Sequence, residues 1–158
     1  MQASVTMLQS ADALIIVAPV YLDLPPYKTL SWLHALVEQC QALHACTPSV
    51  YAICHSGYFE PIHKQASLHA IGHFCRRMEW PWQGGLNFGG TPPIDGKPLE
   101  KAKPFTWRIR PALDELATLV SSGRVFRSGL VARAQRKPMP LPRRLSVWMV
   151  NRMIRQSR

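Results

Sequence analysis

The feature that most constrains the fold is a run of five apolar residues, Leu14 to Ala18, which ends at Pro19. A short, uninterrupted apolar run is typical of a parallel strand that is covered on both faces. Two later segments have a similar character: residues 49–54, and a glycine-flanked stretch within 84–90. The chain is therefore expected to build a sheet from short parallel strands.

Helical patterns separate these strands. Apolar residues recur every three or four positions in 27–40, 60–78 and 105–120, and residues 1–10 resemble the end of a further helix. In the helix over 60–78 the expected core face is Ile62, Ala66, Ala70 and Phe74, with Ile71, Cys75 and Met78 beside it. The alternation of strands and helices predicts an α/β fold of three layers, α/β/α, with a parallel sheet.

Length and composition are those of a single globular domain. The chain has 158 residues, 47% of them hydrophobic, and its longest apolar run is far shorter than the about 20 residues that span a bilayer. No apolar segment of the signal-peptide kind follows Met1. The four cysteines form no CxxC pair, so we expect a cytoplasmic protein with reduced thiols and without an iron–sulfur cluster.

Charge divides the chain into two parts. Residues 1–100 hold five Lys or Arg and seven Asp or Glu, a net −2, whereas residues 101–158 hold fourteen and two, a net +12, and the sum is +10. The expected domains are an α/β unit over 1–123 and a basic extension over 124–158 that ends in a short amphipathic helix. Three interpretations of the extension remain open: a solvated or dimer-clamping tail, a binder of phosphate-rich partners, or contact with an anionic membrane surface. No motif for specific nucleic-acid recognition accompanies it.

The candidate site follows from where ligands bind in open parallel sheets, outside the carboxyl ends of the strands. Two loops are expected there, 19–23 and 55–59, and both are rich in aromatic, Pro, Gly and small polar residues. Such residues suit a planar ring, because an aromatic side chain stacks on its face and backbone N–H groups hold its polar edge. The alternative is that both segments are ordinary crossover loops.

The other reactive side chains give weaker evidence for a metal site or a catalytic site. His69 and His73 share a helix face, but no third ligand and no HExxH-type glutamate accompanies them, so no metal site is expected. Cys54 and His55 are neighbours on a strand and therefore point to opposite faces, which disfavours a Cys–His pair. No residue is assigned as a catalytic acid or base.

Four segments resemble flavodoxin-like NAD(P)H-dependent FMN reductases. They are residues 11–21 (an Ala-Asp pair, an apolar run, then Pro19 and Tyr21), 51–60, 82–90, and the Met-Pro-Leu-Pro of 139–142 with the Trp-bearing helix after it. The resemblance covers most of residues 11–156 and implies a flavodoxin-like fold, FMN as cofactor and NAD(P)H as electron donor. It also implies which residues border the isoalloxazine ring: Pro19, Val20 and Tyr21 on one side, and Ser56, Gly57 and Tyr58 along the other edge.

The sequence also departs from that family. The first strand, the phosphate-binding loop and the second strand of such a domain do not precede Ala11. In the strand order 2-1-3-4-5 the chain would supply only strands 3, 4 and 5, and strand 3 would have an open, apolar edge. We expect a homodimer or another partner to complete this edge, or in-frame coding sequence upstream of Met1 that encodes the absent strand and loop.

Two functions therefore stand as expectations. The first is an FMN-dependent NAD(P)H oxidoreductase, or a truncated remnant of one. The second is a non-catalytic flavodoxin-like interaction module that has lost FMN binding and is associated with a membrane surface through its basic tail.

Overall fold

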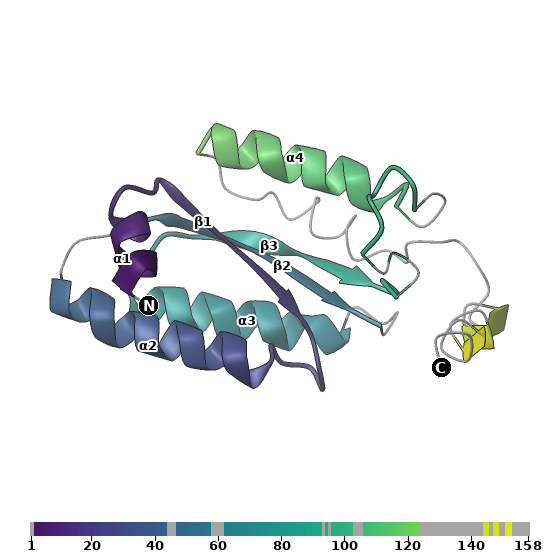
Figure 1. Ribbon diagram of the computed structural model, residues 1–158, viewed down its shortest axis with the longest axis horizontal. Coiled ribbons are helices and arrows are strands. Elements are labelled where there is room, and N and C mark those ends of the chain that lie inside the picture. The colour runs from purple at the N-terminus through teal and green to yellow at the C-terminus, as the bar shows by residue number, and fades with distance from the viewer. Residues whose placement is uncertain are drawn as a thin grey trace.

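The computed structural model describes residues 2–43, 47–57, 62–92, 94, 96–102, 106–123, 144–145, 147–148 and 151–152. Its elements are α1 (Gln2–Gln9), β1 (Ala13–Pro19), α2 (Tyr27–Leu43), β2 (Ser49–Ser56), α3 (Ile62–Arg77), β3 (Trp82–Gly89) and α4 (Ile109–Ser121). The three strands are parallel and lie in the order β1-β2-β3. The predicted α/β class and its parallel sheet are confirmed (Figure 1).

Helices cover both faces of the sheet, as predicted. Helices α2 and α3 lie on one face and α4 lies on the other (Figure 1). The alternation of side chains along the strands divides the core accordingly. Val50, Ala52 and Cys54 belong to the cluster that packs with α2 and α3. Tyr51, together with the apolar residues of β3, belongs to the cluster that packs with α4.

The buried face of α3 differs from the predicted one by about one residue. Ile71 and Cys75 are fully buried, whereas Ala66 is exposed and Phe74 is only partly buried. The polar residue Ser67 is also fully buried, and its hydroxyl donates a hydrogen bond of 2.9 Å to the carbonyl of Asp23. The prediction failed because a serine with an internal partner can occupy a core position that an apolar pattern does not mark.

Two glycines of β3 meet different requirements of the structure. The register with β2 shifts between Val50 and Tyr51, so Gln83 is an extra residue and Gly84 takes a φ of +107° beside it. A Cβ atom on Gly85 would lie 2.6 Å from the carbonyl oxygen of Ala52 and 2.6 Å from Cδ2 of Leu68. Only a residue without a side chain fits at Gly85.

Strand β1 is an edge strand, because β2 is its one hydrogen-bonded neighbour in the described sheet. The N–H of Val20 donates to the carbonyl of His55 (2.8 Å), and the N–H of Ser49 donates to the carbonyl of Asp12 (2.9 Å). Even-numbered residues of β1 therefore direct their backbone groups to β2, and the odd-numbered ones direct theirs to the open edge. This is the open edge that the sequence led us to expect.

The predicted extension 124–158 lies outside the described residues, apart from six positions between 144 and 152 that are helical. Leu145, Val147 and Trp148 are exposed there. In the described ranges no helix is both long enough and apolar enough to cross a membrane.

Candidate functional site

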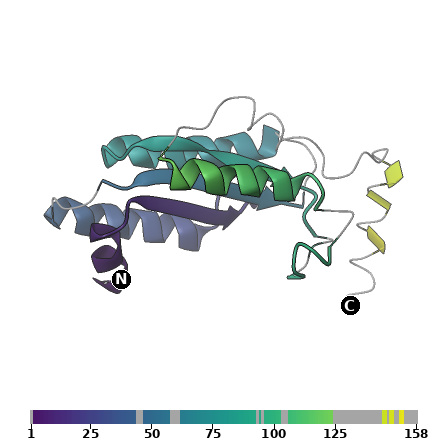
Figure 2. The same ribbon diagram turned by 90° about the horizontal axis from the view of Figure 1, so that it is seen from above.

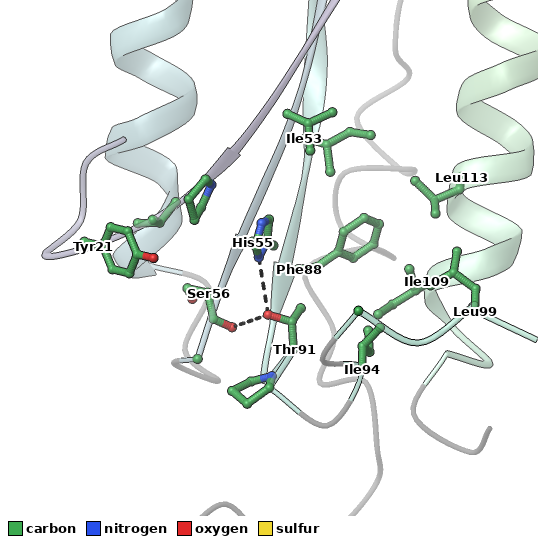
Figure 3. Close-up of a pocket in the computed structure, with 16 residues that line it drawn as sticks. Tyr21, Ile53, His55, Ser56, Phe88, Thr91, Ile94, Leu99, Ile109 and Leu113 are labelled. Atoms are coloured by element: carbon green, nitrogen blue, oxygen red, sulfur yellow. Dashed lines mark hydrogen bonds between the residues drawn. The ribbon is translucent and has the colours of Figure 1, made fainter. Parts of the chain in front are cut away.

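A cavity of about 750 Å³ lies at the carboxyl ends of the strands, on the face of the sheet that carries α4. Figure 3 shows side chains from all three strands, from the loops after them and from α4 around it. The residues that line it are Val17, Pro19, Val20, Tyr21, Ile53, His55, Ser56, Gly57, Phe88, Thr91, Pro92, Ile94, Gly96, Leu99, Ile109 and Leu113. The cavity is thus at the end of the sheet where the sequence placed the candidate site.

The loop after β1 is a tight turn. The backbones of Tyr21 and Leu24 exchange hydrogen bonds of 3.0 and 3.2 Å, and Leu22 and Asp23 between them both have positive φ, +49° and +71°. Two successive residues of positive φ make a type I′ turn, which is rare without glycine or asparagine because each costs about 1 kcal/mol or more. The hydrogen bond from Ser67 to Asp23 anchors this strained turn to α3. Its effect is to hold Tyr21 at the rim of the cavity with an exposed ring.

The loop after β2 is fastened to the loop after β3. The carbonyl oxygen of Ser56 accepts hydrogen bonds from the backbone N–H of Thr91 (3.2 Å) and from its hydroxyl (3.1 Å). Ser56 itself is buried, and Gly57 beside it is exposed. Two of the three loops at this end of the sheet therefore hold each other in place.

Of the six predicted ring-binding residues, the structure brings five together around this one cavity. They are Pro19, Val20, Tyr21, Ser56 and Gly57. The sixth, Tyr58, lies outside the described residues.

The ring of His55 lines the cavity beside the hydroxyl of Thr91. The hydroxyl of Thr91, which donates to the Ser56 carbonyl, lies 3.5 Å from Nδ1 of His55, and which of these two groups donates depends on the tautomer of the ring. In the neutral ring one nitrogen is a donor and the other is an acceptor. Burial lowers the pKa of His55 below its ordinary value of 6.5, which favours the same neutral form.

The lowered pKa of His55 gives an expected pH dependence. The unfolded chain takes up a proton near pH 6.5 that the folded protein takes up only at lower pH, so the free energy of unfolding should fall as the pH drops below about 6.5. His55→Gln should remove this part of the slope, measured by urea unfolding between about pH 5 and pH 8. His69→Gln, at an exposed position on α3, is the matched control and should keep it. An unchanged slope in His55→Gln would contradict the assignment.

Cys54, Cys75, His69 and His73 are not part of the cavity lining. Cys54 and Cys75 are fully buried free thiols, and burial raises the pKa of each to about 12, so neither is available as a thiolate. His69 and His73 are exposed on α3. Across the described ranges no three His, Cys, Asp or Glu side chains gather as a metal site.

Sequence reasoning missed the far wall of the cavity. Thr91 and Pro92 follow β3 directly, so the rule that selected the loops after β1 and β2 would also have selected them. Ile109 and Leu113 of α4 complete the wall, and no local signal distinguishes them from other core residues of an amphipathic helix.

The described lining is mostly apolar. It contains no Lys, Arg, Asp or Glu. The cavity therefore suits a planar, largely apolar group with a polar edge. Its described lining offers no cation to a phosphate.

In comparisons with known proteins, no family model, no curated protein and no solved structure matched this chain.

Proposed function

We propose that the cavity binds the isoalloxazine ring of FMN, and that the chain is a flavodoxin-like, cytoplasmic oxidoreductase that passes electrons from NAD(P)H through this ring. The observation that carries the proposal is the convergence of Pro19, Val20, Tyr21, Ser56 and Gly57 on one cavity at the carboxyl ends of parallel strands. These residues come from two loops that are separated by a whole helix in the sequence.

The chemistry of the lining supports a ring of this kind. Val17, Ile53 and Phe88 offer an apolar surface, and the exposed ring of Tyr21 is held at the rim, where it can stack. The imidazole of His55 also lines the cavity and can exchange a hydrogen bond with the polar edge of the flavin ring. Flavin supplies the hydride chemistry in enzymes of this type, and these residues would orient the ring and keep water from its apolar part.

The described lining provides fewer binding partners for the phosphate of FMN than for its ring. Helix N-termini and Arg or Lys side chains are the usual phosphate partners in proteins, and no cationic side chain lines the described part of the cavity. Ring contacts would then provide most of the affinity. Riboflavin, which lacks the phosphate, should accordingly bind within about threefold of FMN.

Tyr21→Ala is expected to weaken binding of both FMN and riboflavin by about tenfold, because it removes a stacking surface worth about 1 kcal/mol or slightly more. The measurement is a fluorescence titration of each flavin with purified protein. Tyr27→Ala is the matched control, since Tyr27 is also exposed but does not line the cavity. Equal affinities in the two variants would contradict the placement of the ring against Tyr21.

A second candidate function is a non-catalytic interaction module that does not bind FMN, with the basic extension on an anionic membrane surface. The observation that favours it is the open edge of β1, which carries exposed apolar side chains. The flavin titration separates the two candidates, because the module should take up neither flavin.

A further inference from the structure

The open edge of β1 has the hydrogen-bonding groups of an incomplete sheet. Ala13, Ile15 and Val17 direct an N–H and a carbonyl outward, and Pro19 directs only a carbonyl. The strand contains no Lys, Arg, Asp or Glu, the residues with which natural edge strands commonly prevent pairing. This edge is therefore built to accept another strand.

The same residues expose apolar side chains on one face. Ile15 is 42% exposed and Val17 is 61% exposed, although both belong to a seven-residue strand of the sheet. The reason is visible in Figure 2, where α4 lies over β2 and β3 and leaves β1 uncovered. A helix is about 10 Å across and strands are about 4.8 Å apart, so one helix covers about two strands.

We propose that this edge and face bind a second copy of the chain, with the two β1 strands paired antiparallel around a two-fold axis through Ile16. In this register Ile15 lies opposite Val17 of the second copy, and Ala13 lies opposite Pro19. Each outward N–H then meets a carbonyl, and Pro19 needs only to accept. A six-stranded sheet results, and its symmetry limits the assembly to two copies.

The exposed side chains select the antiparallel arrangement. A two-fold axis perpendicular to the sheet keeps the uncovered faces of both copies on the same side, so Ile15 and Val17 of each copy form one apolar cluster. A parallel pairing around an axis along the strands would place them on opposite faces, and they would stay exposed.

Charge does not oppose this pairing. Residues 1–100 carry five Lys or Arg and seven Asp or Glu, a net of −2, and the strong positive charge lies in residues 101–158. In the proposed register Asp12 lies opposite Val20 of the second copy, so no like charges face each other along the strands.

The pairing would also extend the candidate site. Val17 and Pro19 line the cavity, and the start of β1 of the second copy would lie beside them. The proposal does not depend on flavin binding, because it rests on the edge and the face of β1 alone.

The test is sedimentation equilibrium of the full chain between about 1 and 100 µM. We expect a dimer with twice the 17.8 kDa of one chain. Val17→Lys places two ammonium groups in the apolar cluster and should weaken the dimer at least about 100-fold. Because Val17 is exposed in a single copy, the variant should keep its far-UV circular dichroism. Ala117→Lys, at an exposed position of α4, is the matched control and should remain dimeric.

Hydrogen exchange measured by NMR gives a second, independent result. The amides of Ala13, Ile15 and Val17 should be protected in the wild-type dimer, and those of positions 13 and 15 should exchange rapidly in Val17→Lys. A wild-type protein that is monomeric at 100 µM, with these amides unprotected, would overturn the proposal. So would a dimer, or a larger assembly, that Val17→Lys leaves intact.

Discussion

Gly85→Ala is expected to destabilise the protein by about 3 kcal/mol. The added Cβ would lie 2.6 Å from the backbone oxygen of Ala52, the partner of Gly85 in the sheet, and 2.6 Å from Leu68 of α3. A leucine side chain can rotate, but the carbonyl of a central strand cannot move without breaking the ladder between β2 and β3. The substitution should therefore separate α3 from the sheet or distort the strand pairing.

Urea unfolding followed by circular dichroism measures this loss. Gly57→Ala is the matched control: its added Cβ would approach Cγ of Pro92 only to 3.6 Å, an ordinary contact, so its stability should change by less than about 0.5 kcal/mol. If both variants were equally stable, α3 would not pack on β3 as the structure describes.

Substitutions of Asn87 should have the second large effect on the free energy of unfolding, and the sign of the change depends on the new side chain. The side chain is fully buried on β3, between Leu86 and Phe88, which face α4, so it faces α3. Neither its amide nitrogen nor its amide oxygen has a hydrogen-bond partner in the described structure. A buried amide without partners costs about 1–3 kcal/mol, so Asn87→Val should stabilise the protein by about 1–2 kcal/mol.

Asn87→Asp should have the opposite effect. An ionised carboxylate without a partner is much harder to bury than an amide, and the variant should lose about 3 kcal/mol or more at pH 7. The loss should shrink as the pH falls and the carboxylate is protonated. Thermal and urea unfolding of both variants measure these changes. A destabilised Asn87→Val would contradict the account, because it would mean that the amide has a partner.

Much of the fold could be predicted because parallel strands that are buried on both faces consist of consecutive apolar residues. Leu14 to Ala18 marked β1 in this way, and the alternation with helices gave the parallel sheet. Two details were not predictable from local pattern. The first is the bulge at Gly84, which depends on the register between strands. The second is the buried Ser67, whose partner lies 44 residues away in the chain.

Part of the candidate site could be predicted from the sequence. The position of ligand sites in parallel sheets selected the loops 19–23 and 55–59, and the resemblance to flavin reductases selected Pro19, Val20, Tyr21, Ser56 and Gly57 within them. The contact between His55 and the Thr91 hydroxyl was not accessible, since it joins the end of β2 to the loop after β3. The uncovered face of β1 could be expected from the edge position of the strand. That Val17 of this face also lines the cavity could be seen only in the structure.

The most direct test of the proposed flavin site is the absorption spectrum of the purified protein after incubation with excess FMN and removal of free flavin. The account predicts a yellow protein that releases about one FMN per chain on denaturation, and whose flavin is bleached by NADH or NADPH without oxygen. A colourless protein that retains neither FMN nor riboflavin would contradict it.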